Sequence, residues 1–115
     1  MKIVDKPWGH EEIWAHTKRY AGKILHINKG ERLSLQFHEK KEETIYVLEG
    51  KLLLIFGESE DSLKEATLLP GDSKHIKPGL IHRFCAKDED VRLVEVSTAE
   101  LDDVIRLKDD HGRKK

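Results

Sequence analysis

Short apolar segments separated by turn residues are the feature that most limits what this chain can fold into. Eight segments of four to seven residues are rich in Val, Ile, Leu and Thr, and glycine or proline stands between most of them. The predicted strands are 22–27, 33–38, 44–49, 51–56, 66–69, 73–76, 82–86 and 91–97. Even spacing of short strands is typical of an all-β sandwich or barrel. The length of 115 residues suits a single domain.

The two ends of the chain fall outside this pattern. Residues 1–20 read as an N-terminal strand or arm, with Trp8 and Trp14 packing it across the barrel or against a partner. Residues 99–107 are the best candidate for a helical turn, because acidic residues follow Thr98 where a helix dipole favours them. Residues 109–115 are all polar or glycine, so we expect a flexible tail there.

Charge and hydropathy exclude several classes of partner. The 21 Lys and Arg residues nearly cancel the 22 Asp and Glu residues, so the chain lacks the basic excess that nucleic acid binding favours. The longest apolar runs, such as 52–56, are too short to cross a bilayer. No apolar signal stretch follows Met1, and the single cysteine, Cys85, fits a reducing compartment. We therefore expect a cytoplasmic protein with no nucleic acid or membrane partner.

Four side chains of metal-binding type fall at positions that could face one another. Gln36 and His38 share one face of a predicted strand, about 7 Å apart along it. Glu43 begins the next strand, on the face that carries apolar residues, and His82 shares its face with Phe84. A buried acid needs a partner because a bare buried charge is very costly. Shared coordination of a metal ion would satisfy both Glu43 and His82.

A second interpretation of these residues needs no metal. Leu33, Leu35 and Phe37 could form the core face of their strand, which would leave Gln36 and His38 in water. The later histidine, alone after a Pro-Gly turn, would then be a loop residue. Spacing by itself does not decide between these interpretations.

The stretch from Gly30 to Gly50 resembles the first of the two motifs of the cupin superfamily. That motif runs Gly, five residues, His-x-His, four residues, Glu, six residues and Gly. Every interval matches here, with Gln36 in place of the first histidine, followed by His38 and Glu43. The resemblance implies that these residues are metal ligands.

A second stretch, from Gly71 to Ala86, is similar to the second cupin motif. Gly71, Gly79 and His82 stand at the expected intervals, whereas Lys77 and Ala86 replace the usual Pro and Asn. Together the two motifs imply one small cupin domain over residues 1–115, folded as a double-stranded β-helix or jelly-roll barrel. They also imply one divalent metal ion per chain, which could be Zn, Mn, Fe or Ni.

Within the cupins, the chain resembles the phosphomannose isomerases from position 7 to 113. The similar segments are Pro7-Trp8-Gly9, the run 30–38, 82–84, 102–106 and Gly112-Arg113. In these isomerases a Gln-x-His pair, a Glu and a later His hold the metal, as Gln36 would here. The chain departs from them at Glu39 and Lys40, where further histidines are usual, and at His111, where tyrosine is usual.

This resemblance implies a metal-dependent isomerase or epimerase of a sugar or sugar phosphate. A metal can act as a Lewis acid on a carbonyl, and a second group must move the proton. Lys41, if burial lowers its pKa, and Arg83 are the candidate catalytic residues. An iron-dependent dioxygenase and a non-catalytic small-molecule binding domain are the alternatives. Small cupins commonly pair, which implies a homodimer.

Overall fold

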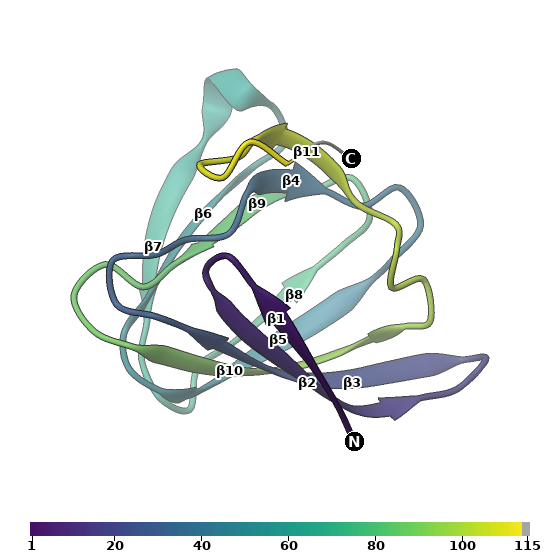
Figure 1. The fold of residues 1–115 in the computed structure, drawn as a ribbon. Helices are drawn as coiled ribbons and strands as arrows, with labels where there is room; N and C mark the ends of the chain where they lie inside the picture. Colours follow the sequence, from purple (N-terminus) through teal and green to yellow (C-terminus); the bar gives the residue numbers. More distant parts are fainter. Residues whose placement is uncertain (114–115) are drawn as a thin grey trace.

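The chain folds into two antiparallel β-sheets that face each other, as the computed structural model of residues 1–113 shows (Figure 1). Sheet A has the strand order β1-β2-β3-β10-β5-β8, and sheet B has the order β11-β4-β9-β6-β7. The strands of sheet A are β1 Lys2–Lys6, β2 Gly9–His16, β3 Tyr20–Ile27, β10 Val91–Thr98, β5 Glu43–Glu49 and β8 Ser73–Ile76. Those of sheet B are β11 Ile105–Lys108, β4 Leu35–Phe37, β9 Ile81–Cys85, β6 Leu52–Gly57 and β7 Lys64–Leu68.

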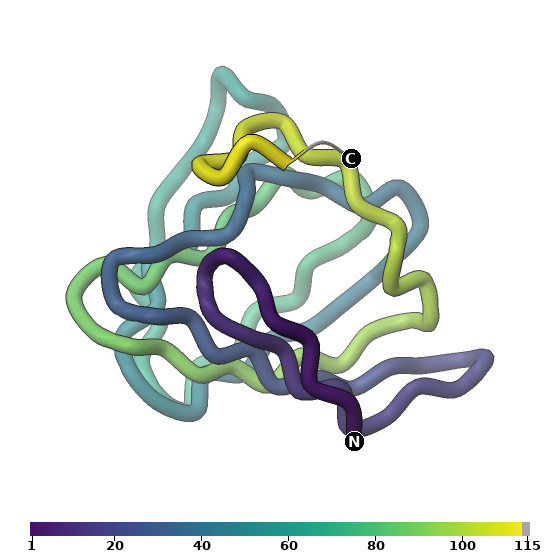
Figure 2. The backbone as a smooth tube through the Cα atoms, viewed as in Figure 1, coloured from purple at the N-terminus to yellow at the C-terminus, as the bar shows by residue number. Residues whose placement is uncertain are grey.

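The predicted all-β class is confirmed, and the architecture is cupin-like, although the two sheets do not join into one closed barrel. The backbone trace shows the two layers converging at one side of the molecule and standing apart at the other (Figure 2). Within residues 1–113 the helical content is one 3-10 turn, Glu60–Ser62. No helix in this part of the chain is long and apolar enough to cross a membrane.

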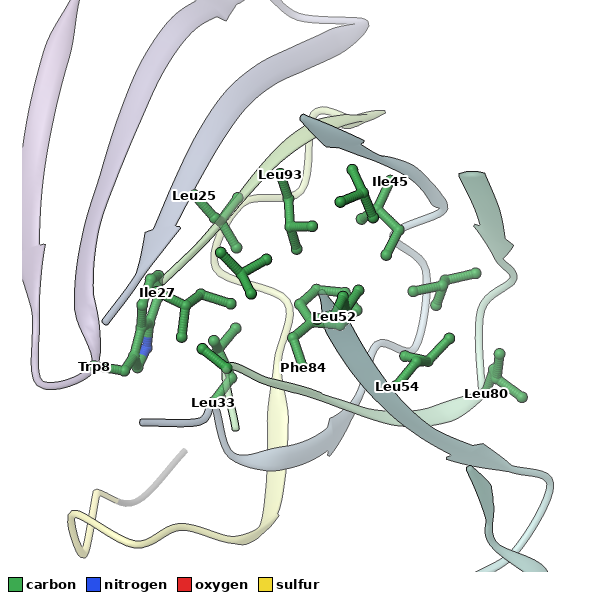
Figure 3. Packing of buried hydrophobic residues seen from close by; sticks show 14 residues of the cluster. Trp8, Leu25, Ile27, Leu33, Ile45, Leu52, Leu54, Leu80, Phe84 and Leu93 are labelled. Atoms are coloured by element: carbon green, nitrogen blue, oxygen red, sulfur yellow. The ribbon is translucent and has the colours of Figure 1, made fainter. Parts of the chain in front are cut away.

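The core lies between the sheets because alternate residues of each strand point inward. Leu25, Leu93 and Ile45 come from sheet A, and Leu54 and Phe84 from sheet B (Figure 3). All five are at most 1% exposed. Burying a side chain of this size contributes roughly 1.5–3 kcal/mol, so this layer of apolar contacts holds the two sheets together.

Both ends of the chain differ from the simplest expectation. The N-terminal arm is a hairpin of β1 and β2 on the edge of sheet A, with Trp8 buried between the sheets. The helical turn predicted over 99–107 is wrong, because Ile105–Lys108 is a strand, β11, paired with β4. The free edge of β4 supplies hydrogen-bonding partners, and such tertiary pairing outweighs a weak local helix signal.

Part of the tail predicted to be flexible is held by ion pairs. Asp110 accepts hydrogen bonds of 2.6 and 2.9 Å from the Arg32 guanidinium, and Asp109 lies 2.8 Å from Nε of Arg113. Polar composition alone does not reveal the first of these pairs, because Arg32 lies 78 positions away from Asp110 in sequence. Residues 114–115 of the predicted tail lie outside the described residues.

Candidate metal centre

Strand pairing places the predicted ligands around one point between the sheets. Gln36 of β4 stands directly opposite His82 of β9, so their side chains share a face of sheet B. Glu43 opens β5 in the facing sheet, where it pairs with Ile76 of β8. His38 follows the end of β4 and is 4% exposed. Residues up to 46 positions apart therefore meet, from 36 to 82.

The two histidines converge on one carboxylate oxygen. Nε2 of His38 lies 3.1 Å from Oε1 of Glu43, and Nε2 of His82 lies 3.3 Å from the same oxygen. The three candidate ligand atoms are within 4.8 Å of one another. Glu43 is 2% and His82 0% exposed, so water does not screen this cluster. Among residues 1–113 it is the one group of three or more His, Cys, Asp or Glu side chains with metal-ligand spacing.

In each histidine Nδ1 contacts a backbone oxygen, so Nε2 is the ring nitrogen that faces the carboxylate. Nδ1 of His38 lies 2.5 Å from the backbone oxygen of Asp103, and Nδ1 of His82 lies 2.9 Å from that of Leu80. A carbonyl only accepts hydrogen bonds, so both Nδ1 atoms donate. Nε2 of each ring is then the atom that faces Glu43 and that is available to a metal ion. Carbonyl partners of this kind orient histidines at metal sites.

Two buried polar atoms of this cluster lack hydrogen-bond partners, and a bound cation would supply a partner to both. Oε2 of Glu43 and Nε2 of His82 are buried and make no hydrogen bond. Burial raises the pKa of Glu43, but His38, His82 and Lys41 outweigh it and hold that pKa well below its usual range. The result is an ionised carboxylate beside the Nε2 atoms of two histidines. Such a set fits a divalent ion with nitrogen and oxygen ligands.

Gln36 lies beside this cluster, next to His82, with which it pairs across strands β4 and β9. Its Oε1 accepts a hydrogen bond of 2.9 Å from the hydroxyl of Ser34. Its side chain lines the cavity together with His38 and Glu43. The structure thus brings Gln36, His38 and Glu43 to one cavity, and His82 joins them through its contact with Glu43. Gln36 as a ligand stays a prediction.

The cavity beside the cluster is about 280 Å³, close to the lower end of the roughly 300–1,000 Å³ of small-molecule sites. Apolar side chains such as Trp8 and Leu101 form part of its wall. Charged side chains form much of the rest, with six cations against four acids. The cations are Lys2, Lys6, Lys23, Lys41, Arg106 and Arg113, and the acids are Glu11, Glu43, Glu95 and Asp102.

Lys41 lies at the cluster, but its ionisation differs from the expectation. Its Nζ is 3.0 Å from Oε2 of Glu95 and 3.8 Å from Oε2 of Glu43. Burial alone would lower the pKa of Lys41, as predicted, yet the two carboxylates outweigh burial and raise it. Lys41 is therefore an ammonium ion in this arrangement, and the lowered pKa expected for a lysine beside a bound metal ion stays a prediction.

Glu95 is a functional candidate that the sequence analysis missed. Burial and the nearby charge of Glu43 raise its pKa to about 8. It lies on the inner face of β10, where it pairs with Lys23 of β3. Lys23 in turn contacts both carboxylate oxygens of Glu11 at 3.2 Å. The alternation of Leu93 with Glu95 could have revealed an acid on the core face of the strand.

Arg83, the other predicted catalytic residue, is not among the cavity-lining residues. Its Nε donates to the backbone oxygen of Leu33 at 2.9 Å, and its Nη2 donates to that of Lys108 at 3.1 Å. Along β9, Arg83 points away from the face that carries His82 and Phe84, as strand alternation requires. These contacts join the C-terminal segment to sheet B.

Two apposed antiparallel sheets around a buried His–Glu–His cluster define a cupin domain. Solved structures with this fold include KdgF from Halomonas sp., with a TM-score of 0.74, 20% identity and 86% of each chain covered. Oxalate decarboxylase of Bacillus subtilis, a protein with Mn(II) centres, has a TM-score of 0.78 and 18% identity over 93% of this chain and 30% of its own. At these identities the likeness concerns the fold alone.

The sequence itself places the chain more narrowly. Residues 1–109 match the family described as mannose-6-phosphate isomerase C-terminal, and the chain belongs to that family. Mannose-1-phosphate guanylyltransferase of Escherichia coli is 27% identical over 114 residues, which are 96% of this chain. The chain spans only 23% of the length of that relative.

Proposed function

We propose that this chain is a metal-dependent isomerase domain that acts on a sugar phosphate. One divalent metal ion would be held by Gln36, His38, Glu43 and His82. The observation that carries the proposal is the cluster of two buried histidines whose Nε2 atoms lie 3.1 and 3.3 Å from one glutamate oxygen. Family membership and the sugar-phosphate enzymes named among its relatives support the substrate class.

The bound metal would supply a Lewis acid beside the substrate carbonyl. An aldose–ketose isomerisation also requires that a proton move between adjacent carbons. Lys41 and Glu95, 3.0 Å apart at the cavity, are the residues proposed to handle this proton. The Lys41 ammonium would hydrogen-bond to oxygen as negative charge develops. Glu95, in its carboxylate form, would take the proton from one carbon and, then protonated, return it to the adjacent carbon.

The remaining polar wall suits a substrate with many hydroxyl groups and an anionic end. Lys23 and Glu11 carry opposite charges and lie side by side on the wall formed by sheet A. Together they offer both hydrogen-bond donors and acceptors to hydroxyl groups. Lys2 and Lys6 line the cavity from β1, and Arg113 lines it from the C-terminal segment. Excess cations of this kind favour a phosphate group. The free, buried Cys85 supports a reducing compartment such as the cytoplasm.

Metal analysis followed by an activity assay tests this proposal. The purified protein should hold close to one divalent ion per chain and should interconvert an aldose 6-phosphate and its ketose 6-phosphate. The His82→Gln variant should lose metal, whereas His75→Gln, which changes an exposed histidine outside the cluster, should keep it. The Gln36→His variant should also keep metal, because it restores the commoner cupin ligand.

Three outcomes would contradict the proposal. Full metal occupancy in both His82→Gln and Glu43→Gln would place the site elsewhere. Oxygen-sensitive iron together with oxygen uptake would indicate a dioxygenase. A protein that binds sugar phosphate with quenching of the cavity residue Trp8, yet never converts it, would be a binding domain.

A further inference from the structure

The free edges of the two sheets enclose a second cavity, here called the seam pocket. β8 is the last strand of sheet A and β7 the last strand of sheet B, and both contribute side chains to its wall. Its volume of about 350 Å³ falls within the roughly 300–1,000 Å³ of small-molecule sites. Among residues 1–113, no side chain lines both this pocket and the cavity at the metal centre. The wall includes Phe56, Glu58, Lys64, Lys74, Lys77 and Leu80.

Two lysines from opposite sheets face the seam pocket. Lys64 of β7 stands opposite Phe56 of β6, whose side chain packs against the core. Lys74 of β8 stands opposite Ile45 of β5, which is fully buried. Directly opposite residues of an antiparallel pair share a face of the sheet. Both lysines therefore lie on the inner faces of their sheets, at positions where a strand normally carries a core residue.

The lysines of the seam pocket outnumber its acids by three to one. Lys77 pairs with Glu58, with 3.3 Å between Nζ and Oε2. Within residues 1–113, no carboxylate lies within 4.0 Å of the ammonium groups of Lys64 and Lys74. Nζ of Lys74 instead lies 4.5 Å from the centre of the Phe56 ring, a cation–π contact that orients the ammonium group without neutralising it. Two positive charges in this pocket therefore lack an acidic partner.

We propose that the seam pocket binds a small organic phosphate monoester. A phosphate monoester carries a charge of about −1.5 to −2 at pH 7, which matches the two charges of Lys64 and Lys74. A carboxylate has one negative charge and would leave one ammonium group uncompensated. Lysine binds phosphate as a point charge, so the ammonium groups need no fixed geometry. Phe56 and Leu80, which adjoin the apolar core (Figure 3), offer contact to the carbon part of such a ligand.

The seam pocket adjoins the residues that hold a candidate metal ligand but does not include that ligand. Phe56 pairs with His82 across strands β6 and β9, and the backbone oxygen of Leu80 accepts the hydrogen bond from Nδ1 of His82. The two cavities have separate walls. The proposal therefore depends neither on metal binding nor on isomerase activity, and each can be tested without the other.

An NMR titration of the full-length protein with phenyl phosphate tests the proposal, because each backbone amide signal reports binding at its own site. The amide signals of Gly57 and His75, both in the wall of the seam pocket, should shift and saturate. Inorganic phosphate lacks a ring, and benzoate carries a single charge. Followed at the same two signals, each should bind about 10-fold more weakly than phenyl phosphate, or weaker still.

Lysine variants test which charges hold the phosphate. Lys64→Gln and Lys74→Gln should each raise the dissociation constant for phenyl phosphate about 10–100-fold, because each removes a charged hydrogen-bond donor. Lys51→Gln is the matched control, since it removes the same charge from an exposed lysine five residues before Phe56, roughly 16 Å along the strand direction. It should leave the dissociation constant unchanged. Unchanged circular dichroism would show that the variants are folded.

Three results would overturn the proposal. The first is the absence of a saturable shift at Gly57 and His75 even with millimolar phenyl phosphate. The inward lysines would then serve only to keep the two sheet edges from pairing with other chains. The second is an equal loss of affinity in Lys51→Gln, which would indicate general attraction between charges. The third is benzoate or inorganic phosphate that binds as tightly as phenyl phosphate, which would assign the pocket to a carboxylate or to the free ion.

Discussion

Asp103 holds His38 and the turn after it through two separate sets of hydrogen bonds. Its backbone oxygen accepts from Nδ1 of His38 at 2.5 Å. Its carboxylate accepts from the backbone nitrogens of residues 39, 40 and 41, at 3.1, 2.7 and 2.9 Å. Burial raises the pKa of Asp103, but the three backbone donors together outweigh burial and lower this pKa to about 2. One residue thereby orients a candidate ligand and positions Lys41.

The Asp103→Asn variant should weaken metal binding without unfolding the protein. An amide has one acceptor oxygen for the three backbone donors and brings donors of its own, so the 39–41 turn should loosen. Loss of such supporting contacts typically lowers metal affinity about 10–100-fold. Competition with a metal chelator would measure the change. Asp102→Asn, at the neighbouring cavity-lining acid, should leave metal affinity unchanged, and equal losses in both variants would contradict this role of Asp103.

Glu95 should make the metal-free protein less stable as the pH rises. Burial and Glu43 raise the pKa of Glu95 to about 8 in the folded state, from an ordinary value of 4.5. The folded state therefore binds this proton more tightly than the unfolded state does. The stability that Glu95 contributes is full below pH 4.5 and is lost as the pH rises through about 8.

Urea unfolding of the metal-free protein at pH 5–9 would measure this dependence. Wild type should lose free energy of unfolding between about pH 5 and 8, and the loss should be smaller in Glu95→Gln, which cannot ionise. Glu43 and Lys41, whose pKa values depend partly on Glu95, titrate below and above this pH range, so the difference between the two curves isolates Glu95. Parallel curves would show that Glu95 is already ionised when folded.

Gly50 should tolerate alanine less well than Gly71 does. Both have a positive φ, +81° and +95°, which strains any residue with a Cβ. A Cβ at Gly50 would lie 2.2 Å from the backbone oxygen of Asp90, whereas one at Gly71 would meet nothing within 4 Å. Gly71→Ala should cost about 1–2 kcal/mol of unfolding free energy. Gly50→Ala should cost roughly 1–3 kcal/mol more, as the clash adds to the strain.

Arg83 should contribute to stability rather than to catalysis. Arg83→Met would remove the guanidinium that donates to the backbone oxygens of Leu33 and Lys108, and both carbonyls would lose a charged partner. Such bonds are worth roughly 1.5–3 kcal/mol each, so stability should fall by at least that amount. Arg32→Met, which breaks a more exposed ion pair with Asp110, should cost less than about 1 kcal/mol.

Metal content and isomerase activity would complete the Arg83 comparison. Both should survive in the folded Arg83→Met protein at a temperature well below its unfolding midpoint. A protein with unchanged stability and metal content but activity reduced more than 100-fold would restore the predicted catalytic role of Arg83.

The strands that pack against the core were predictable because their signal is local. Residues 91–97 alternate Val91, Leu93 and Glu95 with outward residues, and the observed strand is Val91–Thr98. The segment 105–108 carried no such pattern, and its strand exists because the edge of β4 is available for pairing. Local alternation therefore located the central strands, while an edge strand depended on its neighbour.

The candidate ligands were predictable for a different reason. Fixed intervals between Gly30 and Gly50 identified Gln36, His38 and Glu43 as a set, since turn geometry and strand alternation impose those intervals. The ionisation of Lys41 was not predictable in this way. It depends on Glu95, 54 positions later, whose carboxylate outweighs the burial that the neighbouring residues suggest.

The sequence by itself determined the strand pattern, the motif intervals and the family of this protein, because alternation and turn residues act over a few positions. Only the tertiary structure decided which side chains share a cavity. It brought Glu43 between His38 and His82, placed Glu95 against Lys41, and turned Arg83 away. The physical reason is that pairing two sheets fixes distances between residues far apart in sequence, and those distances set burial, charge interactions and the chance of a shared metal ion.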